Sequence, residues 1–239
     1  MDSNKDRVFD VDRVSARAGE ISEGFMRKVY LWMTFGLAAT GAVAYYVLNS
    51  ESMMNMLFGN GMAVFITLAI AELGIVVYLS ARVMKMNPST ASVLFFVYSA
   101  LNGVTIAPLL SLYTNESVAQ VFFISAGLFG GMSVYGFMTR RDLSSWGSFL
   151  MMGVFGIIIA SVVNIFMRSY KANLVISIIA VMVFTGLTAY DTFKLRRLAA
   201  EGGFGDEVRD NLAVVGALSL YLDFINIFIR LLYIFGKRK

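Results

Sequence analysis

Seven long apolar stretches, separated by short polar segments, account for most of the chain. Each is about as long as the roughly 20 helical residues that cross the hydrocarbon core of a bilayer. They cover residues 29–48, 62–83, 91–113, 118–138, 145–167, 173–193 and 212–235. The pattern predicts an all-α polytopic membrane protein with seven transmembrane helices. A polar N-terminal tail, residues 1–27, is expected to precede a single membrane domain, residues 28–239.

The last apolar stretch, residues 212–235, carries four polar side chains on one face. Asp223 lies near its middle, and Ser219, Asn226 and Arg230 lie at i−4, i+3 and i+7 from it. That spacing places all four on one side of a helix. A carboxylate at the centre of a bilayer costs about 3 kcal/mol even on the most lenient insertion scale. We therefore expect Asp223 to face protein, and the other helices to enclose this one.

The composition narrows the chemistry that the protein can perform. Hydrophobic residues make up 58% of the chain and charged residues 15%, far from the composition of soluble domains. There is no cysteine and no histidine, which excludes disulfides, thiol nucleophiles, His-based catalytic triads and the usual zinc sites. The fifteen methionines are assigned to core packing. The sequence predicts no enzymatic activity, no cofactor and no firmly assigned metal site.

The basic residues predict the orientation in the membrane. Fourteen Lys and Arg residues lie in the N-terminal tail and in every second connection after it, with Lys28 and Arg82 at the adjoining span edges included, against two in the other three connections. Short basic connections stay in the cytoplasm, so the N-terminus is predicted to be cytoplasmic. The net charge of +4 and the pI near 9.3 follow from this distribution and do not indicate nucleic-acid binding. The tail lacks an apolar h-region, so the first span is expected to act as an uncleaved insertion signal.

The side on which the C-terminus lies depends on whether the last stretch crosses the membrane completely. The stretch is long enough to cross and lacks Pro and Gly between residues 218 and 235, which favours a full crossing. The basic tail, residues 237–239, would then lie outside the cytoplasm, against the charge bias. A re-entrant last helix remains the alternative.

Small residues in the fourth stretch suggest close helix packing. Gly127, Gly130, Gly131 and Gly136 lie in this stretch, and Gly127 and Gly131 form a GxxxG pattern. Small residues at this spacing let another helix backbone approach closely. We therefore expect a tight helix contact on this face.

Five ionisable residues lie inside the predicted spans or at their edges: Glu72, Arg82, Asp191, Asp223 and Arg230. The plain interpretation of Asp191 is a helix-end acid close to Lys194 at i+3. The plain interpretation of Asp223 is a buried carboxylate neutralised by Arg230 or Arg82.

A more specific hypothesis pairs Asp191 with Asp223. Two carboxylates within hydrogen-bond reach in a low-dielectric site cannot both ionise cheaply, so they would share a proton and act as a pH sensor. Their helices are sequential and antiparallel, so the two meet only if one helix is displaced or that side of the bundle is hydrated. Carboxylate and carbonyl oxygens nearby would suit a hard cation such as calcium. The remaining candidates for an ion ligand or a counter-ion are Glu72, Arg82, Asn226 and Arg230.

One motif suggests a different chemistry. Residues 203–206 match the GxGD pattern of intramembrane aspartyl proteases, and Tyr190-Asp191 matches their YD pattern. That family places both aspartates within helices and needs a Pro-Ala-Leu motif near the C-terminus. Here GFGD lies in a hydrophilic segment, and the only prolines are Pro88 and Pro108. A flexible glycine turn before the last helix is the better interpretation.

The strings LTAYDTFKL, LSLYLDFINIFIRLL and MTRRDLSSWGSFL together resemble the transmembrane Bax-inhibitor-motif family, most closely its bacterial YccA/YbhL-type members. The resemblance covers nearly all of the chain after the tail. It implies two three-helix layers around a central C-terminal helix, which agrees with the enclosure inferred from Asp223. It also implies a bacterial cytoplasmic (inner) membrane as the location.

The resemblance implies that Asp191 and Asp223 are the family's paired aspartates, which in a related bacterial member sense pH and control a calcium leak. Glu72 matches that member's second-helix glutamate, and Arg82 lies one position out of register with its arginine. YccA-type members are also associated with a membrane-anchored ATP-dependent protease. We therefore expect a pH-sensitive calcium or cation leak channel, with a non-conducting regulator of such a protease as the alternative.

Overall fold

The computed structural model describes residues 3–59 and 61–239, with side chains from residue 19 onward except at 58, 61 and 62. Helices account for nearly all of this part of the chain. They are α1 (Ser3–Leu48), α2 (Glu51–Gly59), α3 (Gly61–Arg82), the short 3-10 helix η1 (Val83–Lys85), α4 (Pro88–Leu110), α5 (Asn115–Met138), α6 (Ser144–Met167), α7 (Tyr170–Glu201) and α8 (Asp206–Phe235).

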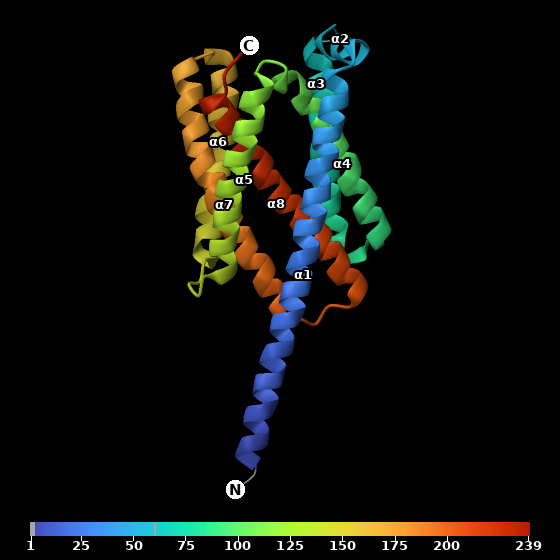
Figure 1. Ribbon diagram of the computed structural model, residues 1–239, viewed down its shortest axis with the longest axis vertical. Helices are drawn as coiled ribbons and strands as arrows, with labels where there is room; N and C mark the ends of the chain where they lie inside the picture. The colour runs from blue at the N-terminus through green and yellow to red at the C-terminus, as the bar shows by residue number, and fades with distance from the viewer. Residues whose placement is uncertain (1–2, 60) are drawn as a thin grey trace.

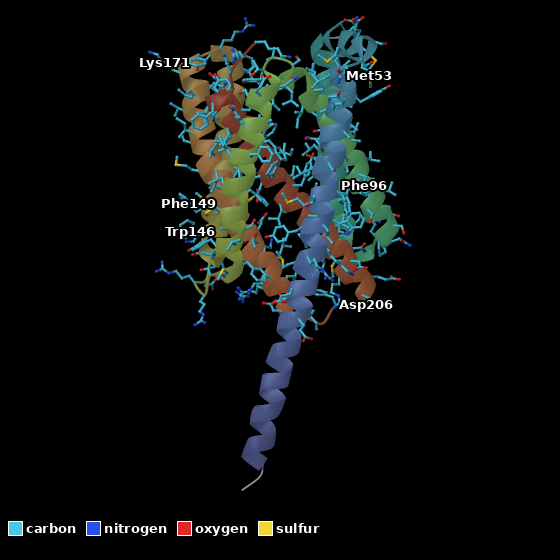
Figure 2. The ribbon with its side chains drawn as sticks, viewed as in Figure 1. Met53, Phe96, Trp146, Phe149, Lys171 and Asp206 are labelled. Carbon is cyan, nitrogen blue, oxygen red and sulfur yellow. The ribbon has the colours of Figure 1, made fainter. Side chains whose placement is uncertain are left out.

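All seven predicted membrane helices are confirmed. Seven of the described helices are long and apolar enough to cross a bilayer. They carry many large apolar side chains on their outer surfaces, as lipid contact requires. Figure 2 shows this at opposite edges of the bundle, where Phe149 of α6 (71% exposed) and Phe96 of α4 (37% exposed) point outward. The short helix α2 lies in the first connection and was not predicted.

Helix α8 is the centre of the bundle. Of the residues in its most apolar stretch, 67% are buried, against 6% to 44% in the other six spans. It runs diagonally between a layer formed by α1, α3 and α4 and a layer formed by α5, α6 and α7 (Figure 1). The two three-helix layers around a central C-terminal helix are therefore confirmed. This placement gives α8 two buried faces, one toward each layer.

Local sequence signals account for the starts of three helices. Asn87 accepts a hydrogen bond from the Ser89 amide at 2.9 Å and precedes Pro88, the first residue of α4. Thr114 accepts the Ser117 amide at the start of α5, and Ser169 accepts the Ala172 amide at the start of α7. Each side chain satisfies one of the free amides of the first helical turn.

The C-terminus lies at the opposite end of the bundle from the N-terminus (Figure 1). Helix α8 is continuous from residue 206 to residue 235. Beyond it, the amide of Lys239 donates to the carbonyl of Leu112, and the amide of Thr114 donates to the carbonyl of Lys237, both at 3.0 Å. The last helix therefore crosses the bundle completely, as favoured from its length, and the re-entrant alternative is wrong.

The packed part of the chain begins before residue 28. Phe25 and Met26 are 3% exposed and belong to the core, and the Ser22 hydroxyl donates to the carbonyl of Arg196. Helix α1 continues without a break into the tail. Part of the predicted tail therefore packs against the bundle, because an apolar face of α1 extends past the polar residues around it, while the boundary between tail and membrane domain at residues 27 and 28 stays a prediction.

The closest helix packing on α5 occurs at Gly136 and not at the predicted GxxxG pattern. A Cβ atom on Gly136 would lie 2.3 Å from the carbonyl oxygen of Ala189 on α7. At Gly127 and Gly131 an added Cβ would meet nothing within 4 Å, and both glycines are exposed. The predicted contact at the GxxxG pattern is therefore wrong within this chain, since that face points away from the bundle.

Candidate functional site

The two predicted aspartates come from the neighbouring helices α7 and α8. The side chain of Ser219 on α8 lies near Asp191 on α7, and the carboxyl of Asp223 lies close enough to that of Asp191 to interact electrostatically. Ser219 and Asp223 are four residues apart on α8, so they share one face of the helix. The structure therefore places the two carboxyls close enough to influence each other, and a shared proton between them stays a prediction.

The diagonal path of α8 reduces the difference in depth between the two aspartates. Asp191 lies ten residues before the end of α7 at residue 201, whereas Asp223 lies seventeen residues after the start of α8 at residue 206. At 1.5 Å per residue the difference along two parallel axes would be about 10 Å. Because α8 runs diagonally across the bundle (Figure 1), it gains less depth per residue than a helix along the bundle axis. This is the displacement that the sequence argument required.

The surroundings of Asp223 are almost dry and poor in hydrogen-bond donors. Its side chain is 4% exposed, and its Oδ2 atom has no hydrogen-bond partner in the described part of the chain. Asp191 is half-buried. On α7, the Thr188 hydroxyl donates to the carbonyl of Phe184, and the Thr185 hydroxyl is buried without a partner. Among the described residues, the polar group shown to affect Asp223 is therefore a second carboxyl, that of Asp191.

This arrangement has a definite chemical consequence. A buried carboxylate without hydrogen bonds is unfavourable, and a second carboxylate beside it makes double ionisation worse. Binding one proton, or one cation with oxygen preference, relieves both problems. The nearest basic side chain with an electrostatic effect on the pair is Lys194 on α7, and its position is exposed. The occupancy of the site by protons or cations therefore changes the charge at the centre of the bundle.

Glu72 belongs to a separate network of hydrogen bonds. It lies at the middle of α3, half-buried against α4. The Thr105 hydroxyl donates to its Oε1 at 2.6 Å, and the Asn102 amide lies 3.5 Å from its Oε2. The Tyr221 hydroxyl of α8 donates to the Asn102 Oδ1 at 3.1 Å and contacts the Thr40 hydroxyl of α1 at 2.6 Å. The network therefore joins α3, α4, α8 and α1.

This network lies on the other side of α8 from the aspartates. Tyr221 and Asp223 are two residues apart, and successive residues of a helix turn by about 100°, so these side chains point in nearly opposite directions. Tyr221 packs edge-on against the rings of Phe95 and Tyr98 of α4. The structure does not place Glu72 beside Asp191 and Asp223. Among the described residues no three acidic side chains are grouped so that they could hold a metal ion.

Replacing Tyr221 by phenylalanine tests the network. Tyr221 is fully buried and bridges Thr40 and Asn102. Removing its hydroxyl leaves the buried oxygen of Asn102 without a donor, so we expect a loss of about 1 to 3 kcal/mol in unfolding free energy. Thermal unfolding in detergent measures it. Tyr45→Phe is the matched control, since Tyr45 is 72% exposed and should change stability little; equal effects would show that the network adds no stability.

The predicted counter-ions do not contact the pair. Arg82 is exposed at the end of α3, and Arg230 is half-buried on α8; neither forms an ion pair in the described residues. The Asn226 amide donates to the carbonyl of Leu222 in its own helix at 2.8 Å. Their roles as ion ligand or counter-ion remain predictions. The interpretation of Asp223 as a carboxylate neutralised by a buried arginine has no support in this geometry.

The GFGD segment lies outside the site. Gly202 and Gly203 have positive φ angles of 68° and 86°, and the segment forms the turn between α7 and α8. Asp206 is 90% exposed and pairs with Arg209. Figure 2 shows Asp206 at the N-terminal end of the bundle. This confirms the interpretation as a glycine turn, and it leaves Asp206 unable to act together with Asp191.

Sequence reasoning missed the partners of Glu72. Asn102 and Thr105 form a polar face at i, i+3 on an otherwise apolar helix. This pattern indicates a buried polar partner, but it does not indicate that the partner is Glu72. Tyr221 gave no signal, since tyrosine is common in membrane helices. Thr40 lies in a small-residue region of α1. In sequence, a threonine that bonds only to a carbonyl of its own helix cannot be told from one that also bonds to another helix. Only the packing of four helices brings these residues together.

Comparison with known proteins identifies the family of the chain. Residues 22–239 match the family model described as Inhibitor of apoptosis-promoting Bax1. The chain belongs to this Bax-inhibitor family. It is 44% identical over 229 residues to the Inner membrane protein YbhL of Escherichia coli (strain K12), which covers 95% of this chain and 96% of that protein. The resemblance inferred from the three sequence strings is thereby confirmed.

Other bacterial relatives match over most of the chain. An uncharacterized protein of Borreliella burgdorferi is 42% identical over 219 residues, and the match covers 92% of this chain and 94% of that protein. One of Rickettsia prowazekii is 41% identical over 215 residues, covering 90% of each. The chain is therefore a multi-pass membrane protein with bacterial relatives that share its whole membrane domain.

Proposed function

We propose that this protein is a pH-sensitive cation leak channel, with calcium as the expected ion, in a bacterial cytoplasmic membrane. Asp191 and Asp223 form its proton sensor, and the N-terminus lies in the cytoplasm. The observation that carries the proposal is the buried Asp223 carboxyl on the central helix, which has an oxygen without a hydrogen-bond partner and Asp191 beside it.

The position of the pair supports a coupling between protonation and helix packing. Asp223 lies on α8, which contacts both layers of the bundle, and Asp191 lies on α7 in one of them. A shared proton allows the two carboxyls to stay in contact, whereas loss of that proton adds repulsion between α7 and α8 in a dry environment. Protonation would therefore bias the equilibrium between two packings of α8.

Glu72 has a separate role in the proposal. It lies mid-span on α3 with two hydrogen bonds that hold a carboxylate in place, and it is on the opposite side of α8 from the aspartates. We assign it to ion binding along the leak pathway, not to the sensor. The ion is a substrate that passes through, so an incomplete ligand set suits passage better than tight storage.

Calcium flux into proteoliposomes tests this proposal. Flux is measured from about pH 5 to about pH 8, and the native protein is expected to show flux that changes with pH, because a coupled carboxyl pair changes its charge as it gains or loses protons. Asp191→Asn and Asp223→Asn should each remove the pH response, because a single carboxyl beside an amide no longer shares a proton. Asp206→Asn, an exposed acid on the same helix, should behave like the native protein.

The outcomes separate the leak from the sensor. No flux above empty liposomes at any pH, with the protein folded, contradicts the channel. Flux that keeps its pH response in both aspartate variants keeps the channel and rejects the sensor. A flux that falls in Glu72→Gln at every pH, with an unchanged pH response, supports the separate assignment of Glu72.

One observation favours the alternative of a non-conducting regulator that binds a membrane-anchored ATP-dependent protease. Helix α1 is 46 residues long and projects well beyond the bundle at its N-terminal end (Figure 1). A projecting helix offers a surface for a protein partner outside the membrane. Deleting residues 3–18 should leave calcium flux unchanged but abolish modulation of such a protease, so the two functions are distinguishable.

A further inference from the structure

A cavity of about 650 Å³ lies between α1, α4, α5 and α8, within the size range of sites for drug-sized ligands. Figure 1 shows α1 and α5 on either side of this region with α8 crossing behind. Its back wall consists of Phe224, Ile225 and Phe228 of α8. It contains none of the residues of the aspartate pair and is therefore a separate feature.

The cavity has the depth of one bilayer leaflet. Along α1 its lining runs from Leu37 to Asn49, twelve residues or about 18 Å of helix. This length is similar to half the thickness of a hydrocarbon core of about 30 Å. Its rim includes Tyr45 and Phe122, which are 72% and 40% exposed, so the cavity is continuous with the lipid-facing surface between α1 and α5. An acyl chain can therefore enter from the side.

Polar groups are gathered at one end of the cavity. Asn49, Ser111, Asn115 and Lys239 line the end nearest the C-terminus. At the other end the one polar lining side chain is Thr40, whose hydroxyl already contacts the carbonyls of Gly36 and Ser99 and the Tyr221 hydroxyl. The apolar part therefore offers a polar solute few hydrogen bonds, and the polar end lies where lipid headgroups would lie.

Lys239 is held at this end by backbone hydrogen bonds. Its amide donates to the Leu112 carbonyl, and the amide of Lys237 donates to the Ser117 hydroxyl at 2.8 Å. Tyr113 and Arg238 form an isolated antiparallel bridge. Within the described residues the ammonium group of Lys239 has no ion-pair partner. A cationic side chain without an ion-pair partner in the described residues, on a backbone held by hydrogen bonds, therefore stands at the polar end of the cavity.

We propose that this cavity is a binding site for one acyl chain of an anionic phospholipid, whose phosphate contacts Lys239 and whose polar end is received by Asn49 and Asn115. The apolar walls match the chain, the depth matches a leaflet, and the ammonium group at the polar end matches a phosphate. The site is independent of the proposed leak, since it uses neither aspartate nor Glu72.

Filling the cavity tests the acyl-chain part of the site. Gly41 lines it, and a Cβ atom there would meet nothing within 4 Å. Native mass spectrometry of the protein from non-ionic detergent, with added palmitoyl-oleoyl phosphatidylglycerol, should show one retained lipid per chain. Gly41→Phe should lose it, and the smaller Gly41→Leu should weaken it. Gly156→Phe is the matched control, since Gly156 is exposed on α6 with equal free space.

Replacing Lys239 tests the headgroup part. Phosphatidylglycerol should be preferred over phosphatidylcholine by about fivefold in the native protein, the effect of one lysine near an anionic headgroup. Lys239→Gln should bind both equally. Glycerol 3-phosphate alone should not displace the lipid. Undiminished lipid binding by a folded Gly41→Phe variant, an unchanged preference in Lys239→Gln, or displacement by glycerol 3-phosphate would each overturn the proposal.

Discussion

Replacing Gly136 by alanine is expected to destabilise the folded protein by roughly 3 kcal/mol, although it adds a single methyl group. That methyl carbon would lie 2.3 Å from the Ala189 carbonyl oxygen and 3.0 Å from two further backbone atoms of Ala189. Backbone atoms cannot rotate away as a flexible side chain can, so α5 and α7 must separate. The higher helix propensity of alanine, about 1 kcal/mol, offsets only part of this loss.

Gly131→Ala on the same helix is the control. An added Cβ there meets nothing within 4 Å, so only the higher helix propensity of alanine changes the stability. The free energy of unfolding should therefore stay the same or rise by up to about 1 kcal/mol. Thermal unfolding of both variants in one detergent measures the difference. If Gly136→Ala were as stable as Gly131→Ala, the close contact between α5 and α7 would not exist in the folded protein.

The fold was predictable because a bilayer imposes strong constraints. A helix that crosses it must be apolar for about 20 residues, and each of the seven spans meets this condition. The enclosure of α8 followed from the cost of placing Asp223 in lipid. The position of the close contact between α5 and α7 could not be predicted in the same way, because a small residue permits another helix to approach without specifying which helix does so. Gly127, Gly131 and Gly136 look alike in sequence, and only Gly136 faces α7.

The candidate site was predictable in part. The prediction that Asp191 pairs with Asp223 followed from two acidic residues on adjacent apolar helices, and the structure places their carboxyls close enough to interact electrostatically. The separation of Glu72 from the two aspartates was not predictable, because α3 and α8 are far apart in sequence and the rotation of one helix relative to the other depends on packing. The same limit applies to Arg82 and Arg230, since a charge pattern along one helix does not fix which side chains meet across helices.

The opposite faces of α8 suggest why both networks matter. Tyr221 joins α8 to α1 and α4 by hydrogen bonds that are satisfied in this structure. Asp223 faces α7 with an oxygen that is not satisfied. One face of α8 is therefore firmly held, while the other contains a group whose favourable state depends on protonation. A change of packing is expected to begin at the contact between α7 and α8.

Replacing Asp223 by asparagine is therefore expected to stabilise the fold by about 1 to 3 kcal/mol at neutral pH, because it removes a buried carboxyl that lacks a hydrogen-bond partner. Loss of function with gain of stability is typical of residues kept for activity. The measurement is thermal or denaturant unfolding in detergent. Asp206→Asn, which loses only an exposed ion pair with Arg209, should change stability by less than about 1 kcal/mol.

The double variant with Asp191→Asn shows whether the two carboxyls act as a pair. Each single change relieves the same repulsion, so the stabilisation by both together should be smaller than the sum of the two. Additive effects would mean that the carboxyls do not interact. A loss of about 3 to 5 kcal/mol in Asp223→Asn would instead indicate that a buried cationic side chain depends on this carboxylate. That result would favour a structural ion pair over the proton sensor, because the carboxylate would then be charged at all physiological pH values.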